Sequence, residues 1–419
     1  MLRRSLGLAL ILLAMAATAA CSGREPDAPP PAAPEIALPA GLPHHLGLGM
    51  ADRPGGSAVM RATAPFDYRY QYLAGGVWES WEAWEPGGRF VEAYIAESKD
   101  AGLVPVFTYY NLVQSLPDNR PERDRALGSL RSQEIMGHYL RGLRAFFEQA
   151  GQAGTTVILH VEPDLWGFAQ QAAKHDDPAT IPAAVHAAGI PEFAALPETL
   201  PGFAQGVVAL RDALAPNVLL GIHASNWATG DDFTYSRPGS SEVDGVASRT
   251  GAFFRRLDAR FDLVFAEFSD RDAGFREHQY GDRGASWWKP EDFARHARFL
   301  SGLRRATGLP LVLWQIPYGN TRMAAIDETW DHYGDNRVEW LLDPDHRSRL
   351  DPYLAAGVVA LLFGRGAAGA TDASDASGDG VTNGSTSAGR QPSLSADDDG
   401  GLFRAWARAY YERGPLTVP

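Results

Sequence analysis

The sequence predicts a single α/β domain with the (β/α)8 barrel fold of the TIM type and long loops after the strands. After residue 44, eight short apolar stretches occur, and helix-like stretches separate most of them. Most of the apolar stretches are continuous, which is typical of parallel strands covered on both faces. Eight such units in about 370 residues match a barrel with long loops.

The predicted strands follow one another in a regular order. They cover residues 45–50, 67–76, 104–112, 155–164, 217–227, 262–272, 309–320 and 357–366. The predicted helices cover residues 89–102, 136–151, 201–216, 250–261, 290–308, 351–357 and 402–414. Gly102 and Pro290 are the stop and start signals of two of these helices.

An open, doubly wound sheet is the alternative fold. It more often has a glycine-rich phosphate loop after the first strand. The stretch GLGMADRPGG, residues 47–56, lacks the G-x-G-x-x-G spacing, and no helix pattern follows it directly. The barrel is therefore the favoured fold, with no internal repeat and no second domain.

The first 21 residues have the pattern of a signal peptide. Arg3 and Arg4 precede an apolar run that is too short for a membrane span, and the stretch ends at Cys21. It resembles a bacterial lipoprotein signal, which implies a lipidated Cys21, although Thr18 stands where such signals carry Leu. Cleavage at an ordinary A-x-A site, which would release a secreted protein, is the alternative.

The chain is therefore predicted to have three segments. Residues 1–21 are the lipoprotein-type signal, residues 22–43 are a Pro/Ala-rich tether, and residues 44–419 are a single catalytic-type barrel domain. Cys21 is the only cysteine, so an intrachain disulfide is impossible. We expect a protein of the bacterial cell envelope, anchored by lipid and facing the periplasm or the exterior.

The charge balance argues against polyanionic partners. The net charge is −13, and no basic run occurs. Nucleic acids and acidic membrane surfaces need clustered Lys and Arg, so neither is expected as a partner, and the lipid anchor is the only expected membrane contact. The chain has 11 Trp, 14 Tyr and 19 Phe, many beside turns and polar residues, where flat faces suit sugar rings.

Polar and aromatic residues gather where the predicted strands end. In a barrel, the carboxyl ends of all strands face one shared site. The predicted substrate-binding residues are Tyr109, Tyr110, His160, Asp164, Trp166, His223, Asn226, Trp227, Asp270, Trp314, Gln315, Asn320 and Arg365.

Two acids at these strand ends form the predicted catalytic pair. Glycoside hydrolysis needs one carboxyl group to protonate the leaving oxygen and a second to attack the sugar or activate water. Glu162, followed by Pro163 and near Trp166, is the predicted general acid, and Glu267 on a mostly apolar strand is its partner. The alternative for each is a structural carboxylate bonded to a loop amide or an arginine.

A family resemblance rests on the stretch HVEPDLWG, residues 160–167, and on the order of elements. The stretch is similar to the acid–Pro–Asp motif of family 6 cellulases, and a Glu after the fourth strand resembles the retaining barrel glycosidases. The sequence departs from the retaining enzymes at Val161, where they have Asn, and at Gln315, where they have the nucleophile. In family 6 the motif mainly binds sugar. The resemblance implies a separate family of glycosidase-like barrels.

Two other patterns contain metal-ligand residue types, and metal binding is the less favoured interpretation of both. His160, Glu162, Asp164 and His223 are ligand types for a catalytic metal, but no H-x-H or H-E-x-x-H motif is present. Asp375, Ser377 and Asp379 match the first half of a calcium loop, whose twelfth position is Thr386 instead of Glu. We expect no cofactor, with a structural calcium ion as the alternative.

Two tryptophan clusters have two possible roles, which are core packing and sugar binding. Trp78, Trp81 and Trp84 are three residues apart, and Trp287 adjoins Trp288. Each set either packs in the core or forms a sugar platform at the barrel mouth.

The sequence therefore predicts a glycoside hydrolase that acts on an oligo- or polysaccharide. A non-catalytic glycan-binding surface lipoprotein is the second hypothesis, and a metal-dependent hydrolase using His160 and His223 is the third. The oligomeric state is left open.

Overall fold

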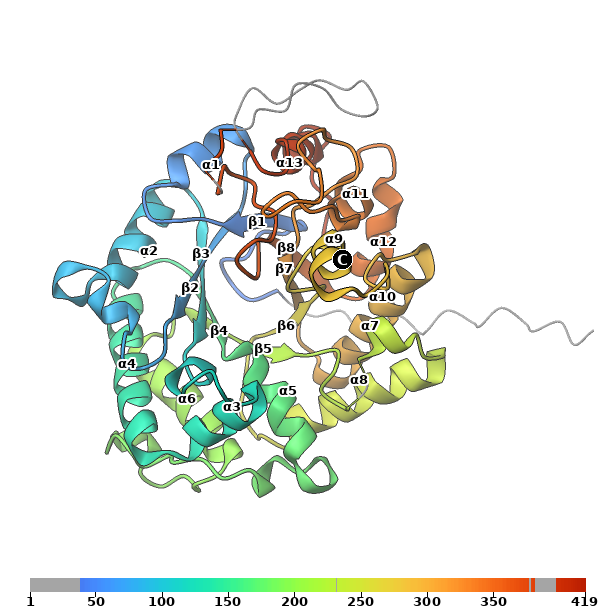
Figure 1. Ribbon diagram of the computed structural model, residues 1–419. Helices are drawn as coiled ribbons and strands as arrows, with labels where there is room; N and C mark the ends of the chain where they lie inside the picture. The colour runs from blue at the N-terminus through green and yellow to red at the C-terminus, as the bar shows by residue number, and fades with distance from the viewer. Residues whose placement is uncertain (1–37, 231, 377, 381–396) are drawn as a thin grey trace, which may run out of the picture. The chain divides into compact units, whose positions relative to one another are not determined.

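The computed structural model is a closed barrel of parallel strands enclosed by helices (Figure 1). It describes residues 38–230, 232–376, 378–380 and 397–419. The strands pair in sequence order, and β1 closes the barrel against β8. They are β1 (Gly47–Ala51), β2 (Tyr68–Ala74), β3 (Val104–Tyr110), β4 (Val157–Val161), β5 (Val218–Ala224), β6 (Leu263–Glu267), β7 (Leu311–Ile316) and β8 (Val358–Phe363). The predicted (β/α)8 fold is confirmed.

Helices form the outer layer of the barrel. They are α1 (Ser57–Thr63), α2 (Phe90–Asp100), α3 (Glu122–Arg131), α4 (Gln133–Gly151), α5 (Pro163–Ala172), α6 (Leu200–Leu214), α7 (Phe233–Ser236), α8 (Ser240–Arg255), α9 (Ala273–Tyr280), α10 (Pro290–Thr307), α11 (Arg337–Leu342), α12 (Asp351–Ala355) and α13 (Leu402–Glu412). The sequence predicted the long amphipathic ones and missed α1, α3, α5, α7, α9 and α11, which are short or lie in the loops after strands.

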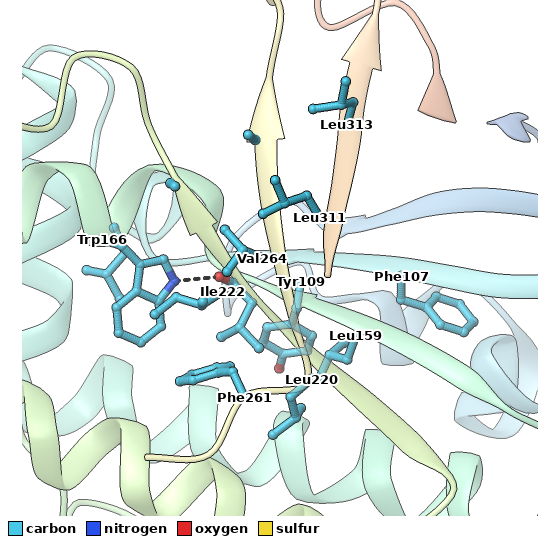
Figure 2. Packing of buried hydrophobic residues seen from close by; sticks show 14 of the residues in the cluster. Phe107, Tyr109, Leu159, Trp166, Leu220, Ile222, Phe261, Val264, Leu311 and Leu313 are labelled. Atoms are coloured by element: carbon cyan, nitrogen blue, oxygen red, sulfur yellow. Dashed lines mark hydrogen bonds between the residues drawn. The ribbon is translucent and has the colours of Figure 1, made fainter. Parts of the chain in front are cut away.

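Two cores hold these layers together. The inner core fills the barrel with side chains such as Tyr70, Ile158, Phe265, Val312 and Leu362. The outer core lies between the strands and the helices, and Figure 2 shows part of it. Since successive residues of a strand face opposite sides, each strand supplies both cores in alternation. The inner face therefore also carries the polar residues that end β3, β4, β5 and β6.

The folded domain includes the end of the predicted tether. Leu42 is 6% exposed and packs with the inner core. The predicted signal peptide, the lipidation site Cys21 and most of the tether lie outside the described residues and stay predictions. Among the residues that are described, no helix is long and apolar enough to cross a membrane.

Candidate active site

A cavity of about 420 Å³ lies at the carboxyl ends of the barrel strands. Its lining comes from the ends of several strands and the loops that follow them, which is where (β/α)8 barrels place their sites. The predicted site residues that line it are Tyr110, Asp164, Asn226, Trp227, Glu267, Asp270, Trp314 and Gln315. The structure thus brings together residues from β3, β4, β5, β6 and β7.

Asp164 reaches the cavity through a sharp turn at the end of β4. Glu162 has a left-handed backbone with φ 42° and ψ 77°, and Pro163 then begins α5. Such a conformation costs a non-glycine residue about 1 kcal/mol or more, so the surrounding contacts must hold it. The turn places Asp164 in the first helical turn, where its side chain lines the cavity.

The environment of Asp164 favours its protonated form. Burial raises the pKa of the Asp164 carboxyl to about 6, the hydrogen bond from Tyr110 lowers it, and the negative charge of Glu267 raises it further. The Tyr110 hydroxyl donates to Asp164 Oδ2 at 2.6 Å. A carboxyl group with a pKa near 6 is suited to donate a proton close to neutral pH.

Glu267 is another of the carboxyl groups that line the cavity. It is the last residue of β6, two positions after the inward-facing Phe265, so it points into the barrel mouth. Its Oε2 lies 2.8 Å from His223 Nε2. Its side chain is 16% exposed, which leaves the carboxyl group accessible from the cavity.

A chain of hydrogen bonds continues from Glu267 into the barrel. His223 Nδ1 lies 3.0 Å from His160 Nε2, and His160 Nδ1 lies 3.4 Å from the Thr108 hydroxyl. An ionised carboxylate can only accept, so His223 donates from Nε2 and, when neutral, accepts at Nδ1 from His160. Burial, and next the neighbouring His223, hold the pKa of His160 well below its ordinary value, which keeps that ring neutral. The chain therefore orients a donor at Glu267.

Glu162 does not line this cavity, so the structure does not bring the predicted pair of Glu162 and Glu267 together there. Its carboxyl group is fully buried, and Oε1 accepts from the backbone amides of Asn111 at 2.9 Å and Leu112 at 3.3 Å. Burial raises the pKa of Glu162 to about 8. The left-handed turn at this residue breaks the strand alternation that predicted an inward side chain. Glu162 instead joins the end of β4 to the end of β3, which fits the structural alternative.

Trp166 is also outside the cavity. It is 1% exposed, and its indole donates to the carbonyl of Val161 at 2.8 Å inside the outer core (Figure 2). Its place on the buried face of α5 keeps the indole out of the cavity lining.

Replacing Trp166 with Phe is expected to destabilise the protein without changing substrate affinity. The smaller ring leaves a void and loses the hydrogen bond to the Val161 carbonyl, which together cost about 1–3 kcal/mol. Urea unfolding measures this loss, and KM should stay that of the wild type. Trp227→Phe is a matched change in the cavity lining. It is expected to change KM and leave the stability close to that of the wild type. A changed KM with unchanged stability in Trp166→Phe would restore the sugar-binding prediction.

Five further predicted binding residues lie beside or beneath the cavity lining. His160 and His223 are fully buried under it. Tyr109 is 2% exposed and donates to the carbonyl of Tyr139, on the outer side of β3. The remaining two are tied to loops: the Asn320 amide donates to the Asp399 carbonyl at 2.8 Å, and Arg365 pairs with Asp331 at 3.2 Å. The strand pattern predicted their position along the chain but not the direction of their side chains.

Tyr110→Phe should move the alkaline limb of the activity profile to higher pH. The lost hydrogen bond normally lowers the pKa of Asp164, so the carboxyl group would keep its proton at higher pH. Rate measurements across pH 4 to 9 would show the shift, on any substrate that the wild type cleaves. The neighbouring Tyr109→Phe removes a hydroxyl outside the cavity and should leave the limb in place. A limb that moves equally in both variants would contradict the role of Tyr110.

Several cavity residues had escaped the sequence analysis. Tyr72 ends the inward face of β2 and accepts from the Gln315 amide at 2.8 Å. Its signal was the alternation of Tyr68, Tyr70 and Tyr72. Tyr235 and Arg276 also line the cavity, but they lie on short helices within loops, whose apolar residues show no helical periodicity in the sequence.

In the described part of the chain, no group of three or more His, Cys, Asp or Glu side chains is arranged to hold a metal ion. All four ring nitrogens of His160 and His223 have hydrogen-bond partners. In the predicted calcium loop, the Asp375 carboxylate accepts from the backbone amides of Asp379 and Gly380, and Ser377 lies outside the described residues.

The tryptophan clusters divide between core and surface. Trp81 and Trp288 are buried, at 0% and 4% exposed. Trp78 and Trp84 are 53% and 42% exposed, but neither lines the cavity, and Trp287 donates to Glu277 at 2.8 Å.

No protein-family model matches this chain, and no curated protein matches it. Solved structures do match. One is the β-glycosidase BGL167, at 14% identity and a TM-score of 0.43, covering 87% of each chain. A β-glucosidase from Thermotoga maritima matches at 12% identity and a TM-score of 0.41, over 73% of this chain and 75% of that one. A family 26 β-mannanase from Bacteroides ovatus matches at 11% and 0.43, over 87% and 90%.

Proposed function

We propose that this protein is a glycoside hydrolase in which Asp164 is the general acid and Glu267 is the second catalytic carboxylate. The observation that carries the proposal is that two of the carboxyl groups lining the cavity have different surroundings. Asp164 is biased towards its protonated form, with a pKa of about 6, and Glu267 receives a hydrogen bond from an oriented histidine. Two carboxyl groups with opposite roles are what acetal cleavage needs.

The surrounding groups suit a sugar. The indole nitrogen of Trp314 and the side-chain oxygen of Asn226 are buried without a hydrogen-bond partner among the described residues, and both residues line the cavity. Leaving such groups unpaired costs about 1–3 kcal/mol each, so a ligand that pairs them is favoured. Sugar hydroxyls both donate and accept, and they match one donor and one acceptor.

A panel of soluble polysaccharides tests the proposal. The purified domain is incubated with galactomannan, mixed-linkage β-glucan, arabinoxylan, dextran and starch, and new reducing ends are counted. We expect one glycan to be cut, and the cutting to disappear in Glu267→Gln. If a glycan binds and the wild type never cuts it, the non-catalytic glycan-binding hypothesis replaces this one. Activity that chelator abolishes would favour the metal-dependent alternative.

A further inference from the structure

The loops after β5, β6 and β7 expose aromatic side chains beside the cavity. Tyr235, Tyr280 and Trp330 are 39%, 58% and 55% exposed. Large aromatic side chains are usually buried, so three of them on adjacent loops form an informative surface feature. We refer to these three residues as the aromatic strip.

The strip is continuous with the cavity. Tyr235, Arg271 and Arg276 line the cavity itself. The Arg276 guanidinium lies 5.5 Å from the centre of the Tyr235 ring, and that of Arg271 lies 5.6 Å from the Tyr280 ring. Both arginines pair with Asp270, which also lines the cavity. The guanidinium groups thus connect the cavity lining to the outer rings.

Trp330 extends the strip and is held in place from behind. Phe275, which is 5% exposed, lies 5.6 Å from Tyr280 and 6.0 Å from Trp330 between ring centres. A Cβ added at Gly369 would lie 2.5 Å from the Trp330 ring, so the ring packs directly on the backbone there. One side of the indole is supported by the protein, while more than half of the side chain remains open to solvent. A supported, exposed ring is suited to bind a flat apolar face.

The charges of the cavity indicate which glycans fit. Besides the general acid Asp164, the carboxyl groups of Glu122, Asp232, Glu267 and Asp270 line it, against the two arginines Arg271 and Arg276. The whole chain is also acidic, at −13. Uronic acid or sulfated glycans would be repelled by this excess of negative charge, whereas an uncharged sugar chain would not.

We infer that the aromatic strip binds the part of a neutral polysaccharide chain that extends out of the cavity. The inference rests on the proposed function, since it places the bond to be cut between Asp164 and Glu267. The substrate class is then an uncharged glycan longer than the cavity holds. Small glycosides would use the cavity alone and gain nothing from Trp330 or Tyr280.

Binding can be measured without cutting in the Glu267→Gln background. Native gels that contain galactomannan, mixed-linkage β-glucan, arabinoxylan, dextran, starch or polygalacturonate report affinity as retarded migration. We expect one neutral glycan to retard the parent, and the added Trp330→Ala or Tyr280→Ala change to weaken binding by about three- to tenfold. Trp84→Ala is the matched control, because Trp84 is 42% exposed, lies outside the cavity lining and contacts Phe90.

Three outcomes would overturn the inference. The strip variants could bind as tightly as the Trp84→Ala control, polygalacturonate could bind best, or no gel could retard the parent. These outcomes are separate from a failure of the proposed function, which would appear as a glycan that the wild-type protein binds and does not cut. On the wild-type background, Trp330→Ala should raise KM for the polymer by a larger factor than KM for an aryl glycoside, which the cavity alone would hold.

Discussion

Glu267→Gln is expected to lower kcat for glycan cleavage by about 10³-fold or more, with the fold intact. The amide cannot attack a sugar or take a proton from water. It keeps the size of the side chain and an oxygen that can accept from His223, which lies 2.8 Å from the carboxylate. Single-turnover rates on the glycan found in the panel would measure the loss, with circular dichroism as the check on folding.

Glu162→Gln is the matched control for this change. Both residues lie at the carboxyl end of a strand. The Glu162 carboxyl group, however, accepts hydrogen bonds from backbone amides and does not line the cavity. We expect its kcat to stay within about tenfold of the wild type, because a displaced turn costs precision but not a reacting group. Equal losses in the two variants would return Glu162 to the catalytic pair. A fully active Glu267→Gln would refute the proposed mechanism.

Asp164→Asn is expected to lower the rate on natural glycans by about 10²- to 10⁴-fold, the usual contribution of a general acid. An amide has no proton to give to the leaving oxygen. The wild-type rate should also fall as pH rises through about 6, since Asp164 then loses the proton it must donate. The variant should lack this alkaline limb.

Two substrates distinguish the loss of an acid from a damaged site. Dinitrophenolate leaves a 2,4-dinitrophenyl glycoside without protonation, so in a single turnover Asp164→Asn should release it nearly as fast as the wild type does. The natural glycan has a poor leaving group and should show the full loss. If both substrates lose the same factor, Asp164 supports binding or structure and another residue supplies the proton.

The barrel could be predicted because each strand carries its own evidence. The stretch at residues 311–314 is continuously apolar, as a strand covered on both sides must be, and the structure has β7 beginning there. Glu267 could be predicted for a related reason, since simple alternation from Phe265 along a regular strand sends its side chain inward. Local pattern was sufficient wherever the backbone stayed regular.

Glu162 and Asp164 show where local pattern was insufficient. The alternation that placed Glu267 also placed Glu162 in the cavity, but the backbone turns left-handed at Glu162 with φ 42°. No neighbouring residue signals that turn. Its support comes partly from Asn111 and Leu112, some 50 positions away in the chain, whose amides bind the carboxyl group. Asp164 therefore enters the cavity through contacts that no single stretch contains.

By itself, the sequence determined the fold, the strand order and the end of the barrel where polar groups gather, because apolar runs and helix periods are local properties. Only the tertiary structure decided which carboxyl groups share the cavity, that His223 and His160 stand behind Glu267, and that Trp166 is buried. It also placed Tyr235, Tyr280 and Trp330 against Arg276, Arg271 and Phe275, respectively. These are matters of side-chain direction at irregular turns and in loops, and contacts between distant segments fix them.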